Sequence, residues 1–193
     1  MEDFFQHTIE QHLSVVETLR EQLPLLHRIA SRMSRTILEG GTILWCGNGG
    51  SAADAQHLAA ELVGRFHRER RGLPSIALTT DTSILTSVAN DYGYEQVFRR
   101  QVEALCAPGD IVVGLSTSGN SRNVCLALEA ARSLGAFTIA FTGQSGGAVA
   151  SIADETLRIL SSETPRIQEA HILCGHMLCD YVEKCVCEAP PTQ

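Results

Sequence analysis

The sequence has little positive charge. Its 15 lysines and arginines stand against 22 aspartates and glutamates, which gives a formal net charge of −7 at pH 7. This acidic balance argues against nucleic acid or an anionic membrane as the main partner, because both attract basic surfaces. An anionic small ligand would have to be held locally, by loop amides and helix N-termini.

Targeting and membrane segments are also missing from the sequence. No apolar run is long enough to cross a bilayer. The first ten residues lack the basic start and the apolar core of a signal peptide. There is no G-x-x-x-x-G-K-[ST] element either, so nothing supports nucleotide hydrolysis of the P-loop type.

The seven cysteines are odd in number, and most of them fall in apolar periodic segments, as Cys125, Cys174 and Cys179 do. This pattern favours reduced core thiols in a cytosolic protein over a disulfide framework. Cys185 and Cys187 have no second Cys/His pair at a zinc spacing, so we interpret them as structural.

Strands and helices alternate along most of the chain. Residues 1–40 show helical periodicity in two amphipathic stretches, and Gly40-Gly41 ends the second. We expect strands at 42–46, 75–79, 110–116, 137–142 and 156–160, and helical regions at 52–66, 83–106, 122–134 and 165–187. The alternation predicts an α/β fold with a five-stranded, mainly parallel sheet flanked by helices on both faces. With no linker or repeat, residues 1–193 should form a single domain with N-terminal helices.

Ligands of such folds bind beyond the carboxyl ends of the strands, which points to the loops 47–51, 80–81 and 116–121. The first loop, GNGGS, has part of a dinucleotide-binding fingerprint. In that fingerprint, an acidic residue follows about 20 residues later. The candidate here is Asp81, which lies much further along the chain. This disfavours nicotinamide binding. The glycines still indicate a backbone that approaches a ligand closely at a helix start.

The loop 116–121, STSGNS, places four hydroxyls and a glycine between a buried strand and a helix. Hydroxyls and amides at a helix N-terminus can bind a phosphate monoester without any lysine. The alternative is that Ser121 is only a helix N-cap and the rest is a turn. Because a cap needs one hydroxyl and not four, we favour phosphate binding.

A candidate acid–base group follows the glycine loop. His57 and Glu61 have the i, i+4 spacing that puts them on one helix face, and His176 lies in the last helix. Ketose–aldose isomerisation needs a base that carries a proton between two carbons, and an acid or metal that stabilises the enediolate. The alternative is a solvated His–Glu pair and a core His176. We take the remaining histidines as structural: His7, His12, His27, His67 and His171.

Together these motifs resemble the sugar-isomerase (SIS) domain proteins, and specifically the phosphoheptose isomerases. The resemblance spans nearly the whole chain. It is carried by CGNGGSAADAQHLAAEL (46–62), ANDYG (89–93), STSGNS (116–121), FTGQSGG (141–147) and RIQEAH (166–171).

The resemblance implies isomerisation of sedoheptulose 7-phosphate to D-glycero-D-manno-heptose 7-phosphate, a step toward nucleotide-activated heptoses for lipopolysaccharide or other surface polysaccharides. It implies that Glu61 is the base and that His176 assists proton transfer. It further implies a cytoplasmic homotetramer, for which we expect residues 1–40 to make oligomer contacts. The implied substrate contacts are Asn48, Gly49, Gly50, Ser51, Glu61, Asn90, Asp91, Ser116, Thr117, Ser118, Ser121 and Gln168. The implied zinc ligands are His57, Glu61, Gln168 and His176.

The implied zinc ligands lead to an expectation about the assembly. Gln168 and His176 are eight residues apart, roughly 12 Å along a straight helix, whereas zinc ligands lie about 2 Å from the metal. We therefore expect helices of neighbouring subunits to share the site.

A related alternative is a non-catalytic SIS scaffold that binds a replication initiator protein. Such a scaffold can lack the carboxylate and imidazole that this chain retains at Glu61 and His176, so we favour the enzyme. Pro165 precedes the RIQEAH motif, and any substrate contact made there by another side chain cannot be transferred.

Overall fold

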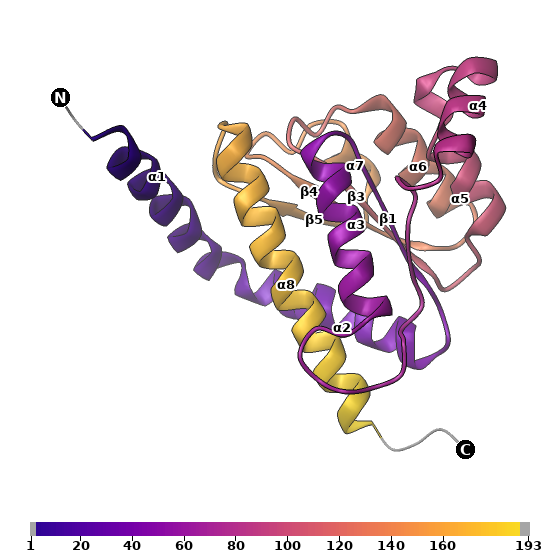
Figure 1. Ribbon diagram of the computed structural model, residues 1–193, viewed down its shortest axis with the longest axis horizontal. Coiled ribbons are helices and arrows are strands. Elements are labelled where there is room, and N and C mark those ends of the chain that lie inside the picture. The colour runs from indigo at the N-terminus through magenta and orange to yellow at the C-terminus, as the bar shows by residue number, and fades with distance from the viewer. Residues whose placement is uncertain (1–2, 190–193) are drawn as a thin grey trace.

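The computed structural model describes residues 3–189, so the predicted single domain over 1–193 extends beyond the described residues at both ends. Its centre is a five-stranded sheet in the order β2-β1-β3-β4-β5 (Figure 1). Every pair of neighbouring strands is parallel, which confirms the predicted α/β fold. The strands are β1 (Ile43–Gly47), β2 (Ser75–Ala77), β3 (Ile111–Ser116), β4 (Phe137–Thr142) and β5 (Glu155–Arg158).

Alternate residues of each central strand face opposite layers of helices, as the two-residue period of a strand requires. Ile43 and Trp45 of β1 belong to the core on one face, and Leu44 and Cys46 to the core on the other. All five residues of β1 are buried. This double burial explains why the central strands read as continuous apolar runs.

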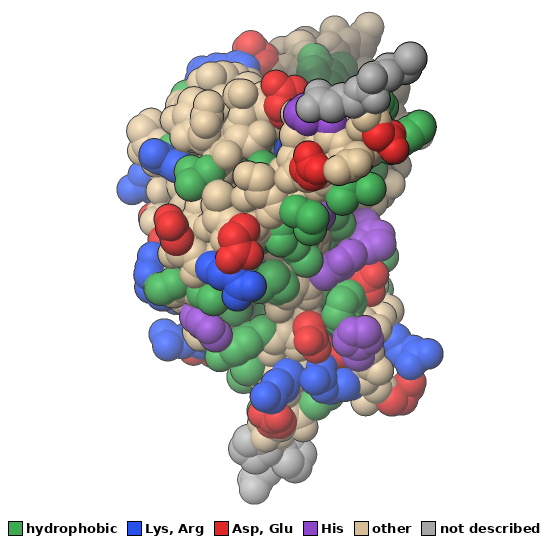
Figure 2. Space-filling view, turned by 90° about the vertical axis from the view of Figure 1, so that its left-hand side faces the viewer, with side chains coloured by type: hydrophobic (Ala, Val, Ile, Leu, Met, Phe, Trp, Pro, Cys, Tyr) green, Lys and Arg blue, Asp and Glu red, His purple; other side chains and the backbone are tan. Residues whose placement is uncertain are grey.

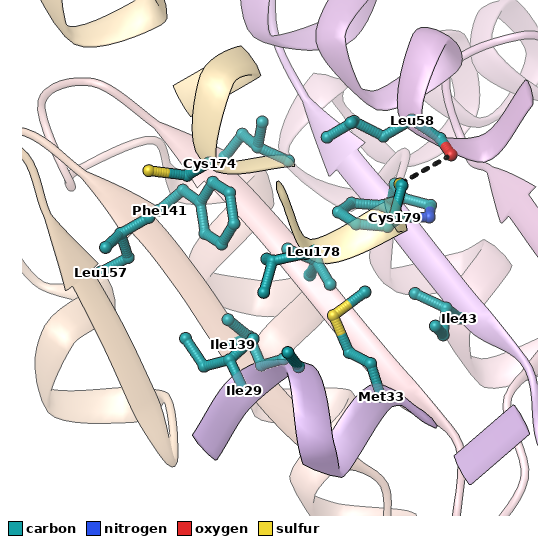
Figure 3. Close-up of a cluster of buried hydrophobic side chains, with 14 of the residues drawn as sticks. Ile29, Met33, Ile43, Leu58, Ile139, Phe141, Leu157, Cys174, Leu178 and Cys179 are labelled. Atoms are coloured by element: carbon teal, nitrogen blue, oxygen red, sulfur yellow. Dashed lines mark hydrogen bonds between the residues drawn. The ribbon is translucent and has the colours of Figure 1, made fainter. Parts of the chain in front are cut away.

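The first helical layer consists of α2 (Leu23–Leu38), α3 (Gly50–Val63) and α8 (Thr164–Glu188). Figure 3 shows how Met33 of α2, Leu58 of α3 and Leu178 of α8 meet over the strand residues Ile43 and Ile139. The opposite face is covered by α4 (Thr82–Tyr92), α5 (Arg99–Leu105), α6 (Arg122–Ser133) and α7 (Val149–Ile152).

The helical region expected over 83–106 is three separate helices. The chain turns at Gly93, whose φ of +92° is accessible to glycine at little cost, and continues as a 3₁₀ turn (Tyr94–Gln96) before α5. Elsewhere the expected boundaries lie within three residues of the observed ones: β4 matches the expected 137–142, whereas α3 begins at Gly50 and ends at Val63. Such offsets are normal because helix ends are the weakest part of the periodic signal.

Helix α1 (Phe4–Thr18) projects away from the sheet and has no buried residue (Figure 1). Its apolar side chains, for which we expected oligomer contacts, lie exposed: Phe4 and Phe5 at 75%, and Ile9 and Leu13 at 59%. A short 3₁₀ turn (Leu19–Gln22) joins α1 to α2. These four side chains therefore lie largely uncovered among residues 3–189, whereas Val15 packs against the core.

The cysteines are reduced in the described chain, as predicted. All seven are free, and Cys46, Cys125, Cys174 and Cys179 are buried. Burial raises the pKa of Cys174 and of Cys179 to about 12, so these thiols are protonated and unreactive. Among residues 3–189, no helix combines the length and apolar character needed to cross a bilayer.

Candidate active site

The glycine loop after β1 and the hydroxyl loop after β3 lie side by side, because β1 and β3 are adjacent parallel strands. A pair of side-chain amides connects the two loops. Asn48 Nδ2 donates to Asn123 Oδ1 at 2.9 Å, and Asn123 Nδ2 donates to Asn48 Oδ1 at 2.8 Å. The Tyr94 hydroxyl also donates to Asn48 Oδ1, at 3.1 Å. Sequence reasoning missed the buried Asn123, although it lies only two residues after the STSGNS motif.

Gly49 is the N-cap of α3 and has a φ of +57°, with no atom within 4 Å of where a side chain would begin. The space beside Gly49 is therefore open at the N-terminal end of α3, where the first backbone amides lack intrahelical partners. Gly50 lies against Gln168 of α8, whose Nε2 would be 2.5 Å from a Cβ at this position. Two residues predicted to contact substrate, Gly50 and Gln168, are thus in direct contact.

In the hydroxyl loop, Ser116 and Ser121 bond to each other through their side chains, at 2.9 Å. Ser121 is the N-cap of α6 but its hydroxyl makes no capping bond. The Ser121 hydroxyl therefore does not cap α6, and phosphate binding by this loop stays a prediction. Thr117 is half-buried, and Ser118 is exposed with its hydroxyl accepting from the Asn120 amide at 3.1 Å. The hydroxyls and the start of α6 can face a small anion.

The glycine-rich turn at 143–147 packs against the hydroxyl loop. The amide of Gly143 donates to Thr117 O, and that of Val149 donates to Gly119 O, both at 3.0 Å. Gly119 has a φ of +70°, and a Cβ there would lie 2.1 Å from Gly146 O. Only glycine fits this contact, which fixes the residue type at position 119.

The predicted acid–base residues come together at the surface between α3 and α8. His57 Nε2 lies 2.8 Å from His176 Nε2 and 3.1 Å from Glu61 Oε1, and the three ligand atoms all lie within 4.8 Å of one another. The side chain of His57 is 50% exposed and that of Glu61 is 22% exposed. Seen from the left-hand side of Figure 1, several histidine and acidic side chains lie at the surface of the molecule (Figure 2).

His176 is partly exposed, so the alternative of a core histidine does not apply to it. Burial lowers its pKa and the neighbouring His57 lowers it further, while Glu61 acts in the opposite direction. The core histidine of α8 is His171, which is fully buried and lies 3.2 Å from Thr142 O through Nε2. Burial lowers the pKa of His171 to about 4, which agrees with the predicted structural role.

A glycine brings the two helices close enough for this group to form. At Gly175, directly before His176, a Cβ would lie 2.5 Å from Leu58 Cδ2, and Leu58 directly follows His57. Leu58 is itself fully buried. The absence of a side chain at Gly175 therefore sets the spacing between the imidazoles.

A model of the SIS domain family matches residues 4–143 of the chain. The phosphoheptose isomerase of Aquifex aeolicus is 56% identical over 184 residues, which cover 95% of each protein. The chain belongs to the phosphoheptose isomerase family. Solved structures of phosphoheptose isomerases agree: that from Neisseria gonorrhoeae has a TM-score of 0.84 at 43% identity, covering 93% of this chain and 95% of that one. The Francisella tularensis structure has a TM-score of 0.87 at 38% identity, and the match covers 94% of this chain and 95% of that one.

In this phosphoheptose isomerase family member, a single chain supplies His57, Glu61 and His176. The expectation that neighbouring subunits share the ligands is therefore not needed for these three. Gln168 lies at the glycine loop, two turns before His176 on α8, so its place in a shared ligand set stays a prediction.

The remaining predicted substrate residues of this family member lie around the two loops. Ser51 is buried in the first turn of α3. Asn90 and Asp91 lie exposed near the end of α4, where Asn90 Nδ2 donates to Asp91 Oδ1 at 2.8 Å. Asp81 caps the start of α4 by accepting from the Ile84 amide at 2.9 Å, which gives that loop a structural role.

Asp54 is a titratable residue near His57 that sequence reasoning did not single out. It lies one turn before His57 on α3, and its Oδ2 is buried without a hydrogen-bond partner among the described residues. Burial raises its pKa to about 6, against an opposing effect of His57. The i, i+3 spacing to His57 was a readable signal of this position.

Proposed function

We propose that the chain isomerises sedoheptulose 7-phosphate to D-glycero-D-manno-heptose 7-phosphate, in the synthesis of nucleotide-activated heptoses for lipopolysaccharide or another surface polymer. The observation that carries the proposal is the convergence of Glu61, His57 and His176 on α3 and α8, the helices whose first turns meet where Gly50 lies against Gln168. The names of the relatives, at more than 50% identity, support the same reaction.

In the proposed reaction, the Glu61 carboxylate removes a proton from C1 of the ketose and returns it to C2. His176 transfers a proton between the two oxygens, so that the C1 hydroxyl becomes the aldehyde and the C2 carbonyl becomes a hydroxyl. The lowered pKa of His176 favours the neutral imidazole, the form in which a ring nitrogen can accept a proton or bind a metal ion. The hydroxyls of Ser116, Thr117, Ser118 and Ser121, with the amides at the start of α6, would hold the 7-phosphate.

The residues also fit a zinc ion. Two imidazole nitrogens and a carboxylate are a common zinc donor set, and ligand atoms about 2 Å from a tetrahedral ion are roughly 3.3 Å apart. The separations of 2.8 Å and 3.1 Å are close to that value. His57, Glu61 and His176 would hold the ion, with Gln168 as the fourth predicted ligand. When bound, zinc would stabilise negative charge on the enediolate oxygens as a Lewis acid.

The proposed assembly is a cytoplasmic homotetramer with no nucleic-acid or membrane partner. Its support is α1, whose exposed apolar side chains form a face that a second copy could cover. The scaffold alternative has no support among the relatives, and the retained acid–base pair favours the enzyme.

We expect the purified protein to convert sedoheptulose 7-phosphate to the aldoheptose phosphate, followed by NMR. A chelator should lower the rate at least tenfold, and added Zn²⁺ should restore it, if the ion supplies the charge stabilisation proposed above. A folded, zinc-loaded protein that does not turn over would overturn the proposed function. Equal rates with and without chelator would overturn the zinc assignment alone.

Replacing Gly119 with alanine should raise the KM for the sugar phosphate at least tenfold. A Cβ would collide with Gly146 O and force the hydroxyl loop apart, in addition to the cost of a positive φ. Gly109→Ala is the matched control, because Gly109 has a φ of +93° but open space around it, in the turn before β3. Steady-state kinetics of the two variants separate the effects, and equal KM values would argue against phosphate binding by this loop.

A further inference from the structure

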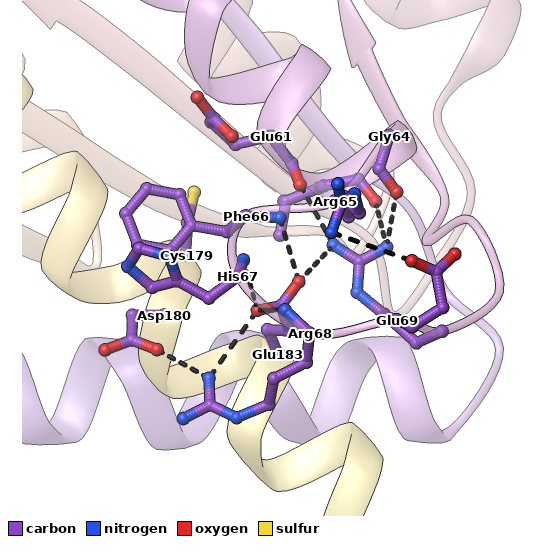
Figure 4. A network of polar contacts seen from close by, with 12 residues as sticks. Glu61, Gly64, Arg65, Phe66, His67, Arg68, Glu69, Cys179, Asp180 and Glu183 are labelled. Atoms are coloured by element: carbon purple, nitrogen blue, oxygen red, sulfur yellow. Dashed lines mark hydrogen bonds and ion pairs between the residues drawn. The ribbon is translucent and has the colours of Figure 1, made fainter.

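A buried carboxylate outside the acid–base group organises the segment that follows α3. Glu183 lies seven residues beyond His176 on α8, two turns along the same helix face. Its side chain is 0% exposed. It accepts backbone N–H bonds from Phe66 at 2.9 Å and from His67 and Arg68 at 2.8 Å each (Figure 4). Residues 64–74 have no helix or strand of their own, so these bonds define the path of the segment.

Arg70 connects this carboxylate to the end of α3. Its side chain is 4% exposed, and its Nη2 lies 3.1 Å from Glu183 Oε1. The same guanidinium donates to the carbonyls of Glu61 at 2.9 Å, Leu62 at 2.9 Å and Gly64 at 3.0 Å. These carbonyls lie at a helix C-terminus, where they lack intrahelical partners and attract positive charge. A single side chain therefore bridges the backbone of Glu61 and the carboxylate of Glu183.

The same contacts place an aromatic ring beside the site. The centroid of the Phe66 ring lies 5.5 Å from that of His176, at an interplanar angle of 37°. The amide of Phe66 is one of the three that Glu183 holds. Burial acts to raise the pKa of Glu183, but the three amides and Arg70 outweigh it and hold the pKa below its usual range. The group is therefore a charged acceptor at neutral pH.

We propose that Glu183 is a positioning residue of the isomerase. With Arg70, it fixes the end of α3 and the 64–70 segment to α8, and so sets the places of Glu61 and Phe66 relative to His176. The inference rests on the proposed function, because it assigns Glu61 and His176 to proton transfer. A shift of about 1 Å between such groups can lower a rate roughly 100-fold.

The test is Glu183→Gln, with Asp180→Asn as the matched control. Asp180 lies one turn earlier on α8 and shares the partner Arg68, at 2.6 Å, but its side chain is 46% exposed. An amide can accept through only one of its ends, so the glutamine loses at least one of the amide bonds and the ion pair. We expect kcat to fall at least tenfold with KM within threefold of wild type, whereas Asp180→Asn stays within twofold in both. A Glu183→Gln kcat like that of the control, or a loss confined to KM, would overturn the proposal.

Arg70→Lys provides a second variant in case Glu183→Gln does not fold. It keeps the charge but loses the fork that reaches both Glu183 and the α3 carbonyls, so we expect the same split between kcat and KM. In the ligand-free proteins, the NMR signals of the His176 ring, assigned with His176→Gln, should shift in Glu183→Gln or Arg70→Lys and not in Asp180→Asn. This readout does not depend on turnover. Unchanged ring signals would overturn the positioning role, whereas shifted signals in a protein whose wild type is inactive would overturn the proposed function alone.

Discussion

Replacement of Glu61 by glutamine should lower turnover by about 10²–10⁴-fold while leaving sugar-phosphate binding nearly unchanged. The glutamine keeps the size of the side chain but cannot accept the proton that must leave C1. The loops after β1 and β3 would hold the 7-phosphate. Among residues 3–189, the Glu61 side chain makes no hydrogen bond to either loop. The measurement is kcat by NMR or a coupled assay, together with the Kd of the sugar phosphate by calorimetry.

Glu69→Gln is the control for this variant. Glu69 lies in the segment that follows α3, and its side chain is 87% exposed with only a 3.6 Å contact to Arg65. Removing its charge should leave both constants within twofold of wild type, since exposed ion pairs contribute little. A folded Glu61→Gln protein with full activity would remove Glu61 from the catalytic role. A large loss of binding instead would mean that the carboxylate mainly holds the substrate.

The layout of the sheet was predictable because it depends on local patterns. Strands that are buried on both faces, such as β1, read as short apolar runs, and the glycines after them mark where the chain leaves the sheet. The rule that parallel sheets bind ligands at the carboxyl ends of their strands then located both loops. His57 and Glu61 were also readable, since their spacing of four residues is a local property of one helix.

The parts that the sequence did not reveal depend on contacts between distant segments. Glu183 reads as one more polar residue near the end of a helix, and its partners lie more than 110 residues earlier in the chain. The pairing of Asn48 with Asn123 spans 75 residues. No periodicity encodes such contacts, because they appear only when the helices are packed on the sheet. The exposed apolar face of α1 is a similar case, since amphipathicity predicts that a face is covered but not by what, and the oligomer contacts expected for residues 1–40 stay a prediction.

The close approach of α3 and α8 leads to the second large expected effect. Gly175→Val should lower kcat about 100-fold, because the added side chain meets Leu58, which is buried and cannot turn into solvent. The helices must separate, and with them His57 and Glu61 from His176, whose reactive atoms are now within 4.8 Å of one another. Misplacement of about 1 Å is enough for a loss of this size.

Leu58→Ala in the Gly175→Val background tests this reason directly. The truncation removes the atoms that a side chain at position 175 would meet. The kcat of the double variant should therefore be at least tenfold higher than that of Gly175→Val. Leu58→Ala alone should destabilise the fold by about 2–5 kcal/mol through the cavity it leaves, and the valine should fill part of that cavity. Urea unfolding and kcat measured on all four proteins form a double-mutant cycle. Strictly additive losses would show that the two residues act separately, and that the spacing of the imidazoles is set by something other than the contact between Gly175 and Leu58.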